Sequence, residues 1–248
     1  MRKPLFFLLL LAGILSAACN AQKPRGKIDT FTTKDGKKVV ITPIKHGSLQ
    51  INYDGIEFQI DPVASAVGEV VDYSDKPKAD YILITHDHYD HFDPTTYPLL
   101  VKRNTEIILT LRCYNRIKTG IVMRNGDKAD LGRGITLHAL PAYNTTKSRM
   151  KYHPRGWGNG YLLDLNGFRI YIAGDTEDIP EMKNLKDIDI AFLPCNQPFT
   201  MTVKQLRHAV EMIRPKVLYP YHFSNTDKDS MEQVGKGLGI DVRVYDFE

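Results

Sequence analysis

Three histidines and one aspartate stand within six residues of this chain, as His86, His88, Asp90 and His91 in the pattern His-x-His-x-Asp-His. Imidazole nitrogens and carboxylate oxygens together suit zinc first, with manganese or iron as alternatives. The competing interpretation is a polar loop whose histidines are satisfied by hydrogen bonds. Four ligand-type side chains in so short a stretch favour the metal site.

The element that must position this cluster is the apolar run Tyr81–Ile84, which comes just before it and is typical of a buried strand. On an extended backbone, residues two apart point the same way, so His86 and His88 can meet at one ion. Asp90 and His91 follow where the chain turns off the strand, and they can face a second ion. The motif therefore predicts two neighbouring metals.

Other predicted strands also end in a ligand-type residue. Asp61 follows the alternating segment Ile56–Ile60, and two further cases are Asp175 after Phe168–Ala173 and His222 after the strand that begins at Lys216. Asp61 has two interpretations, a carboxylate that orients a metal-bound histidine or a turn aspartate before a proline. A site assembled from several strand ends is the expectation.

The long irregular stretch Pro141–Gly160 is too long to be only a connection. Four basic residues crowd its middle: Lys147, Arg149, Lys151 and Arg155. They suit an anionic substrate such as a phosphate or carboxylate, and a solvated loop is the alternative. Candidate substrate contacts in this stretch are Tyr143, Asn144, Lys147 and Trp157.

Helices and hairpins fill the rest of the chain. The pairs Asp35-Gly36 and Asp54-Gly55 predict hairpin turns in the first quarter. Thr202 and Gln205 form a capping box before a helix that Pro215 ends. Two shorter helices are predicted at 94–101 and 230–236. Strands that alternate with helices in this way indicate an α/β protein.

The N-terminus has the composition of a secretion signal. Two basic residues precede the apolar run Leu5–Leu15, and small residues lead up to Cys19. Residues 1–21 are interpreted as a signal peptide, or residues 1–18 as a lipoprotein signal with a lipid on Cys19, which we favour slightly. We expect an exported bacterial protein, either periplasmic or anchored to the outer membrane, with residues 22–248 forming one domain.

Composition limits the partners. The formal net charge of the 248 residues is +4, and it falls to about +2 once the signal is removed, so bulk charge gives no reason to expect nucleic acid as a partner. Beyond Cys19 only Cys113 and Cys195 remain, too few for a disulfide framework. The predicted partner is a small-molecule anionic substrate.

Taken together, four motifs resemble the metallo-β-lactamase superfamily: Asp61-Pro62, the cluster at 86–91, Gly174-Asp175-Thr176 and Tyr221-His222. The resemblance covers most of the chain and implies a four-layer αββα sandwich. It also implies that His86 and His88 bind the first metal, that Asp90, His91 and His222 bind the second, and that Asp175 bridges them. Asp90 and Asp175 would then be the catalytic carboxylates.

The chain departs from the family pattern at the third histidine of the first metal. Where relatives carry that histidine, this chain has Tyr143-Asn144, and the nearby candidates are His153 and His138. We favour His153, because it lies in a loop beside a proline, whereas His138 lies inside a predicted strand. His46 and His208 are left out of the predicted ligand set.

The resemblance implies a hydrolase with two divalent ions, zinc first and manganese or iron next. Lactam hydrolysis is disfavoured, because Asp175 stands where zinc β-lactamases carry a cysteine. The branch that contains ascorbate-6-phosphate lactonase and lipid phosphodiesterase-like enzymes is the nearest in pattern. The expected reaction is cleavage of an ester, lactone or phosphodiester bond. The alternative is a non-catalytic periplasmic metal-binding or ligand-binding protein of the same fold.

Overall fold

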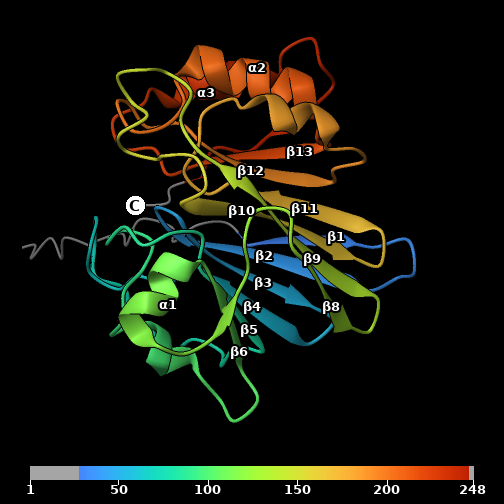
Figure 1. Ribbon diagram of the computed structural model, residues 1–248. Helices are drawn as coiled ribbons and strands as arrows, with labels where there is room; N and C mark the ends of the chain where they lie inside the picture. Colours follow the sequence, from blue (N-terminus) through green and yellow to red (C-terminus); the bar gives the residue numbers. More distant parts are fainter. Residues whose placement is uncertain (1–27, 246–248) are drawn as a thin grey trace, which may run out of the picture.

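The computed structural model describes residues 28–245. The predicted signal and Cys19 lie outside the described residues. Within them, two seven-stranded sheets pack face to face, with α2 and α3 over one outer face and α1 beside the other (Figure 1). This arrangement matches the predicted four-layer αββα sandwich.

Each half of the chain builds one sheet. The first sheet runs in the order β1 (Asp29–Thr32), β2 (Lys38–Lys45), β3 (Ser48–Tyr53), β4 (Ile56–Ile60), β5 (Tyr81–Leu83), β6 (Glu106–Leu109) and β7 (Ile121–Val122). The second runs in the order β14 (Asp241–Val242), β13 (Val217–Tyr221), β12 (Ile190–Pro194), β11 (Phe168–Ile172), β10 (Gly158–Leu165), β9 (Ile135–Ala142) and β8 (Lys128–Gly132).

Both sheets combine an antiparallel half with a parallel half. Strands β1 to β4 pair antiparallel, and β4 to β7 pair parallel. In the second sheet β8 to β11 are antiparallel and β11 to β14 parallel. The carboxyl ends of β2, β4 and β5 therefore meet at one edge of the first sheet. Those of β9, β11 and β13 meet at one edge of the second.

The core lies between the sheets and follows from strand patterning. In β2, buried and half-exposed residues alternate, whereas every residue of β12 and β13 is buried. Continuous burial is expected for parallel strands that are covered on both faces. A smaller apolar cluster around Phe92, Leu100 and Cys113 packs on the other side of the first sheet.

The helices partly match expectation. Helix α2 (Val203–Ile213) has the predicted capping box at Thr202 and Gln205, and it buries Leu206, Val210 and Ile213. The prediction of a helix at 94–101 is wrong, because only a short 3₁₀ helix forms there, at Tyr97–Leu100. Pro94 and Pro98 lack the amide protons that a longer helix would need. The last predicted helix divides into α3 (Lys228–Glu232) and a 3₁₀ turn at Gln233–Gly235.

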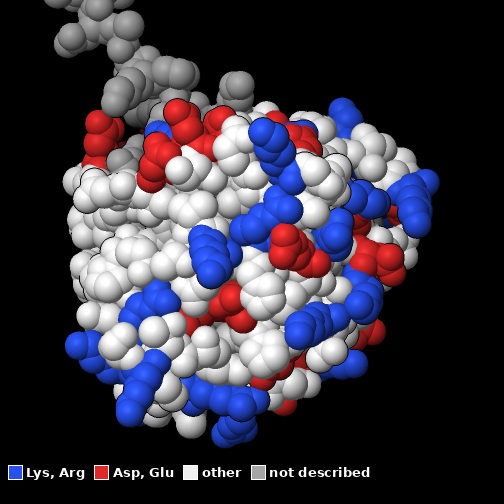
Figure 2. Space-filling model, turned by 90° about the horizontal axis from the view of Figure 1, so that it is seen from above, with Lys and Arg blue, Asp and Glu red and all other residues white. Residues whose placement is uncertain are grey.

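Two further elements complete the fold. Helix α1 (Leu111–Ile117) occupies a region to which sequence patterning gave no clear assignment, and a 3₁₀ helix covers Pro180–Asn184. None of the helices among residues 28–245 has the length and apolar character needed to cross a membrane. Basic and acidic side chains are interspersed over the face in Figure 2.

Candidate metal centre

The site lies where the carboxyl ends of the two sheets' strands come together. Two groups of ligand-type side chains form there: His86, His88, His153 and Asp175, and His46, Asp90, His91 and His222. Within each group, the candidate ligand atoms all lie within 4.8 Å of one another. We call these the first and the second donor group.

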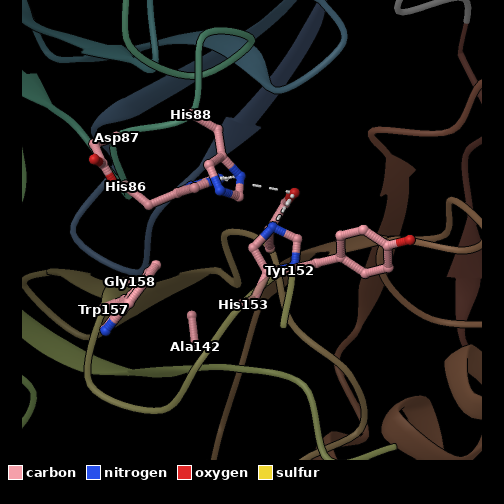
Figure 3. Close-up of a pocket in the computed structure, with 9 residues that line it drawn as sticks. His86, Asp87, His88, Ala142, Tyr152, His153, Trp157 and Gly158 are labelled. Carbon is pink, nitrogen blue, oxygen red and sulfur yellow. Dashed lines mark hydrogen bonds and ion pairs between the residues drawn. The ribbon is translucent and has the colours of Figure 1, made fainter. Parts of the chain in front are cut away.

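The first donor group joins the motif after β5 to a loop of the second sheet (Figure 3). His86 Nε2 is 3.1 Å from His88 Nδ1, and His153 Nε2 is 3.1 Å from Asp175 Oδ2. His153 Nδ1 faces the carbonyl oxygen of Phe199 at 3.1 Å. Because a carbonyl only accepts, Nδ1 carries the proton, and the lone pair on Nε2 is directed into the site.

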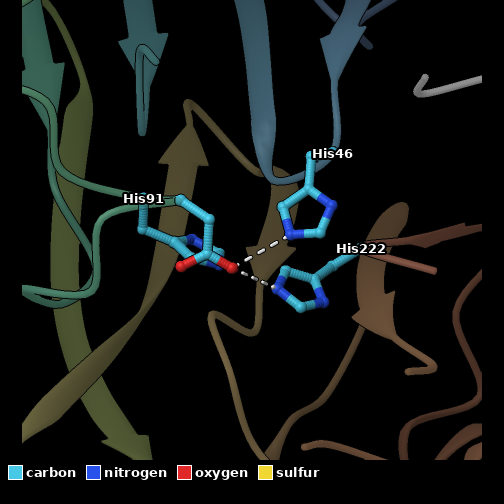
Figure 4. A group of neighbouring side chains, drawn as sticks. His46, His91 and His222 are labelled. Atoms are coloured by element: carbon cyan, nitrogen blue, oxygen red, sulfur yellow. Dashed lines mark hydrogen bonds and ion pairs between the residues drawn. The ribbon is translucent and has the colours of Figure 1, made fainter. Parts of the chain in front are cut away.

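In the second donor group, Asp90 lies beside three histidines, and Figure 4 shows these histidines, His46, His91 and His222. Asp90 Oδ2 is 3.1 Å from His46 Nε2 and 3.3 Å from His222 Nε2. The rings of His46 and His222 have their centroids 3.8 Å apart, and the amide of His222 donates to the carbonyl oxygen of His46. Two separate strand ends are thus held together beside one carboxylate.

Asp175 lies between the two groups. Its Oδ1 is 3.3 Å from His91 Nε2, and its Oδ2 is 3.3 Å from His222 Nε2 and 3.8 Å from His86 Nε2. It comes three residues after the end of β11 and directly after Gly174, whose φ is +63°. A Cβ at position 174 would lie 2.8 Å from the carbonyl oxygen of Asn159, so glycine is needed for the chain to pass there.

Asp61 supports histidines of both groups. Its Oδ2 accepts from His91 Nδ1 at 2.7 Å and from the Thr85 hydroxyl at 2.6 Å. Since the only hydroxyl proton of Thr85 goes to Asp61, the 3.0 Å contact with His86 Nδ1 must be a bond from the imidazole N–H to Thr85 Oγ1. Both imidazoles are therefore oriented with Nε2 toward the site.

Three residues at the site have a left-handed backbone conformation. Among the described non-glycine residues with positive φ are His46 at +50°, Asp61 at +43° and His222 at +47°. Side chains rarely adopt this conformation, and it persists where the surrounding structure enforces it. Gly47 also makes room, because a Cβ there would lie 2.6 Å from Cε1 of His91.

The electrostatics of the site suit cations. Burial alone would raise the pKa of Asp90 and of Asp175, but the surrounding histidines outweigh it and hold both below the usual range. Burial lowers the pKa of His86, of His88 and of His46, the last to about 4, so these imidazoles are neutral at pH 7. In His91, Asp175 and Asp61 overcome burial and raise the pKa well above 6.5.

These residues fit divalent metal ions. The ion pairs recorded for Asp61, Asp90 and Asp175 in the described part of the chain are all with histidines. Three ligand-side atoms, His91 Nε2, His153 Nε2 and Asp175 Oδ1, are buried without an aligned hydrogen bond. Buried carboxylates beside neutral imidazoles are stabilised by a coordinated cation.

The structure brings together every residue predicted as a ligand, His86, His88, Asp90, His91, His153, Asp175 and His222. His138 is elsewhere, half-exposed on β9 opposite Leu162, while its neighbours Leu137 and Ala139 point into the core. His208 is exposed on α2 and pairs with Asp178. Sequence reasoning missed His46, although it too follows a strand, β2.

Three of the four predicted substrate contacts do not line the pocket beside the first donor group. Asn144 is 1% exposed, and its amide donates to the carbonyl oxygens of Arg149 and Phe199. Tyr143 is buried and donates to Glu181, and Lys147 points to solvent. Trp157 alone of the four is a lining residue. Hydrogen bonds to Glu181 and Phe199 hold Tyr143 and Asn144 away from the pocket.

The basic residues of this loop also lie outside the pocket lining. Arg149 Nε is 2.7 Å from Glu177 Oε1, and Arg155 Nη2 is 2.8 Å from Glu181 Oε1. Lys151 lies over the ring of Tyr152. Two of the four charges are therefore neutralised by carboxylates.

Comparison with known proteins places the chain in a family. Residues 40–222 match the β-lactamase superfamily domain. The chain belongs to the metal-dependent hydrolases of the β-lactamase superfamily. A metal-dependent hydrolase of Carboxydothermus hydrogenoformans is 28% identical to it over 82% of this chain and 95% of the relative. Another, from Nanoarchaeum equitans, is 32% identical over 60% of this chain and 71% of the relative.

Solved structures agree with this assignment. A protein of Parabacteroides distasonis, provisionally named a metal-dependent hydrolase, is 51% identical, with a TM-score of 0.85 over 90% of this chain and all of that one. The metallo hydrolase Igni18 of Ignicoccus hospitalis is 25% identical, with a TM-score of 0.70 over 84% of this chain and 95% of that one. This chain thus shares its fold with these two proteins over most of each chain.

Proposed function

We propose that this metal-dependent hydrolase uses two divalent ions to cleave an ester, lactone or phosphodiester bond in a small-molecule substrate. Zinc is the preferred metal. The observation that carries the proposal is the pair of donor groups that meet at Asp175. Each group offers imidazole nitrogens and one carboxylate, a donor set that suits zinc, with manganese or iron as alternatives.

The first ion would be held by His86, His88 and His153, the second by His46, Asp90, His91 and His222, with Asp175 shared. Divalent ions in such sites lower the pKa of water to about 7 and so supply a hydrolytic nucleophile at neutral pH.

The chain's own residues have distinct roles in this proposal. Asp90 lies beside His222 and His46, which hold its pKa below the usual range, so its carboxylate is ionised and can orient the attacking water. Asp61 keeps His91 and, through Thr85, His86 in the orientation that presents Nε2. His153 keeps its orientation through Phe199.

We also propose that the substrate is anionic. The argument for this is the positive charge of two bound metal ions, rather than the basic residues of the loop 141–160. Arg149 and Arg155 are engaged by Glu177 and Glu181, whereas a phosphate or carboxylate would be attracted directly by two bound ions. Lys147 is exposed on the same loop and is free to add to that field.

The experiment is a substrate screen with the protein loaded with Zn²⁺ or Mn²⁺. Aryl esters, lactones and bis-p-nitrophenyl phosphate represent the three bond types. Turnover of at least one class is expected, and Asp90→Asn should reduce it by about two orders of magnitude or more. A protein that holds two ions and cleaves none of these bonds would refute the hydrolase proposal and favour the non-catalytic alternative.

We also propose export, with a lipid on Cys19 after cleavage of residues 1–18. The support is the sequence pattern of the N-terminus alone. Cell fractionation of the wild type and of Cys19→Ser tests the anchor. Release of the variant into the soluble exported fraction is expected, and a variant that stays with the membrane would rule out the lipid.

A further inference from the structure

The pocket beside the first donor group has two different sides. His86, His88, His153 and Asp175 supply the ligand-type lining, and Ala142, Tyr152, Trp157 and Gly158 supply carbon-rich surface (Figure 3). Asp87 is also a lining residue, and its carboxylate is paired with Arg112. Trp157 and Tyr152 lie on either side of His153 in this view. A substrate whose reacting group occupies this pocket would therefore lie beside these two aromatic side chains.

Trp157 is exposed to an unusual degree for its size, with 43% of its surface accessible. The guanidinium of Arg112 lies 3.9 Å from the centroid of its ring and covers one face. Any ligand that stacks on this indole must therefore use the face that Arg112 does not cover. Gly156, at φ +85°, lets the chain turn immediately before Trp157.

Arg112 serves as a support rather than as an anion receptor. Its Nε is 2.8 Å from Asp87 Oδ1, and Arg116 Nη1 donates to the carbonyl oxygen of Asp87 at 2.7 Å. Asp87 stands between His86 and His88 in the metal-binding motif. The contacts from Asp87 to Arg112 and from Arg112 to Trp157 therefore connect Trp157, which we call the aromatic wall, to that motif. Because its charge is paired, Arg112 offers little attraction to a substrate anion.

We propose that Trp157, held by Arg112, selects substrates that carry a planar apolar group, such as an aryl ring, next to the scissile bond. An aryl ring can stack flat on the face of the indole that Arg112 does not cover, whereas a puckered ring of similar size meets that face only through its C–H groups and makes a weaker contact. This specificity rests on the proposed hydrolase function, and it names the part of the substrate that lies against the wall.

The first test measures binding and does not depend on turnover. Trp157 is the single tryptophan of the sequence, so its emission reports directly on this pocket. The full chain reconstituted with Zn²⁺ is titrated with benzoate and with cyclohexanecarboxylate, which share a carboxylate and a six-membered ring but differ in planarity. Benzoate should change the emission and bind roughly tenfold more tightly, the range expected for one aromatic contact.

Variants test whether the preference for benzoate comes from Trp157 or from its neighbours. Where a variant lacks the indole, calorimetry measures the binding affinity. Trp157→Leu should abolish the preference for benzoate, and Trp157→Phe should keep part of it. Arg112→Met should weaken it, because the indole loses its support. Leu111→Ala is the matched control, since Leu111 is 45% exposed beside Arg112 and is not a lining residue, and it should leave the preference unchanged.

The second test compares hydrolysis of phenyl acetate and cyclohexyl acetate by the same variants. If neither ester nor any screened substrate is cleaved, the proposed hydrolase function fails. The binding data still test whether Trp157 prefers a planar group. Equal affinity for the two carboxylates, or an undiminished preference for benzoate in Trp157→Leu, would overturn the specificity proposal. Loss of that preference in Leu111→Ala would also overturn it.

Discussion

Glu177→Gln tests how the chain holds His153, which arrives from a loop rather than from a strand end. Glu177 stands two residues after Asp175, and its side chain is fully buried. One oxygen, Oε2, accepts from Thr145 N and Oγ1 and from Thr146 N at 2.7 to 2.9 Å, and the other is 2.7 Å from Arg149 Nε. Glu177 thus ties the loop that carries His153 to the strand end that carries Asp175.

The expected loss of stability follows from the negative charge that the glutamine amide removes beside Arg149. Breaking a buried ion pair costs about 3–5 kcal/mol when one charge is left without a partner. Arg149 keeps hydrogen bonds to Gln197, the Thr200 carbonyl and Gln205, so we expect a smaller loss, about 2–3 kcal/mol in the free energy of unfolding. A loosened His153 should also weaken metal binding at the first donor group by roughly 10- to 100-fold.

Urea unfolding of the metal-free protein and competition with a chelator for the loaded protein measure the two effects. Glu181→Gln is the matched control, because Glu181 pairs with Arg155, another arginine of the same loop, which is 69% exposed. An exposed pair contributes about 0–1 kcal/mol, and metal affinity should not change. The reasoning is refuted if Glu177→Gln costs no more than Glu181→Gln, or if it weakens the second donor group instead of the first.

Three further predictions concern the supports of the site and the stability of the fold. Asp61→Asn should lower metal affinity by roughly 10- to 100-fold, because the bond to His91 Nδ1 loses its charge, and unchanged chelator competition would contradict this. Gly47→Ala should displace the His91 ring and release metal from the second donor group, so full metal content would count against the close approach. Burial raises the pKa of Glu57 from 4.5 to about 7, so the folded state favours its neutral form. The contribution of Glu57 to the free energy of unfolding is fully present below pH 4.5 and falls as the pH rises from 4.5 to 7. Above pH 7 it stays constant, after a total loss on the order of 3 kcal/mol. Glu57→Gln should therefore stabilise the protein against urea at pH 8 but not at pH 4, and equal differences at both pH values would refute the assignment.

Strand ends were the most informative feature of the sequence. The same local pattern, a polar residue directly after an apolar strand, pointed to Asp61, His86, Asp175 and His222. Carboxyl ends of parallel strands meet at one edge, so such residues come together without knowledge of distant contacts. Helix α2 was equally readable, since its cap and its apolar stripe are both local signals.

His46 escaped because its relevance depends on sheet order. Strand β2 pairs antiparallel with β3, which pairs antiparallel with β4, so the ends of β2 and β4 reach the same edge. Nothing within the segment around His46 indicates that pairing.

The loop's contacts were also out of reach, because Arg149 finds Glu177 and Asn144 finds Phe199 only through tertiary folding. A count of basic residues shows charge but not whether that charge is already paired. Of the four predicted substrate contacts, Trp157 is the one that lines the pocket, and it stays a prediction as a contact.

The central claim is that two donor groups sharing Asp175 bind two metal ions. Native mass spectrometry of the protein reconstituted with Zn²⁺ tests it most directly, together with the variants His153→Ala and His46→Ala. Two ions per chain are predicted for the wild type, with weakened binding of one ion in each variant and additive loss in the double variant. A wild-type protein that binds one ion or none, or two variants that both retain wild-type metal affinity, would contradict the account.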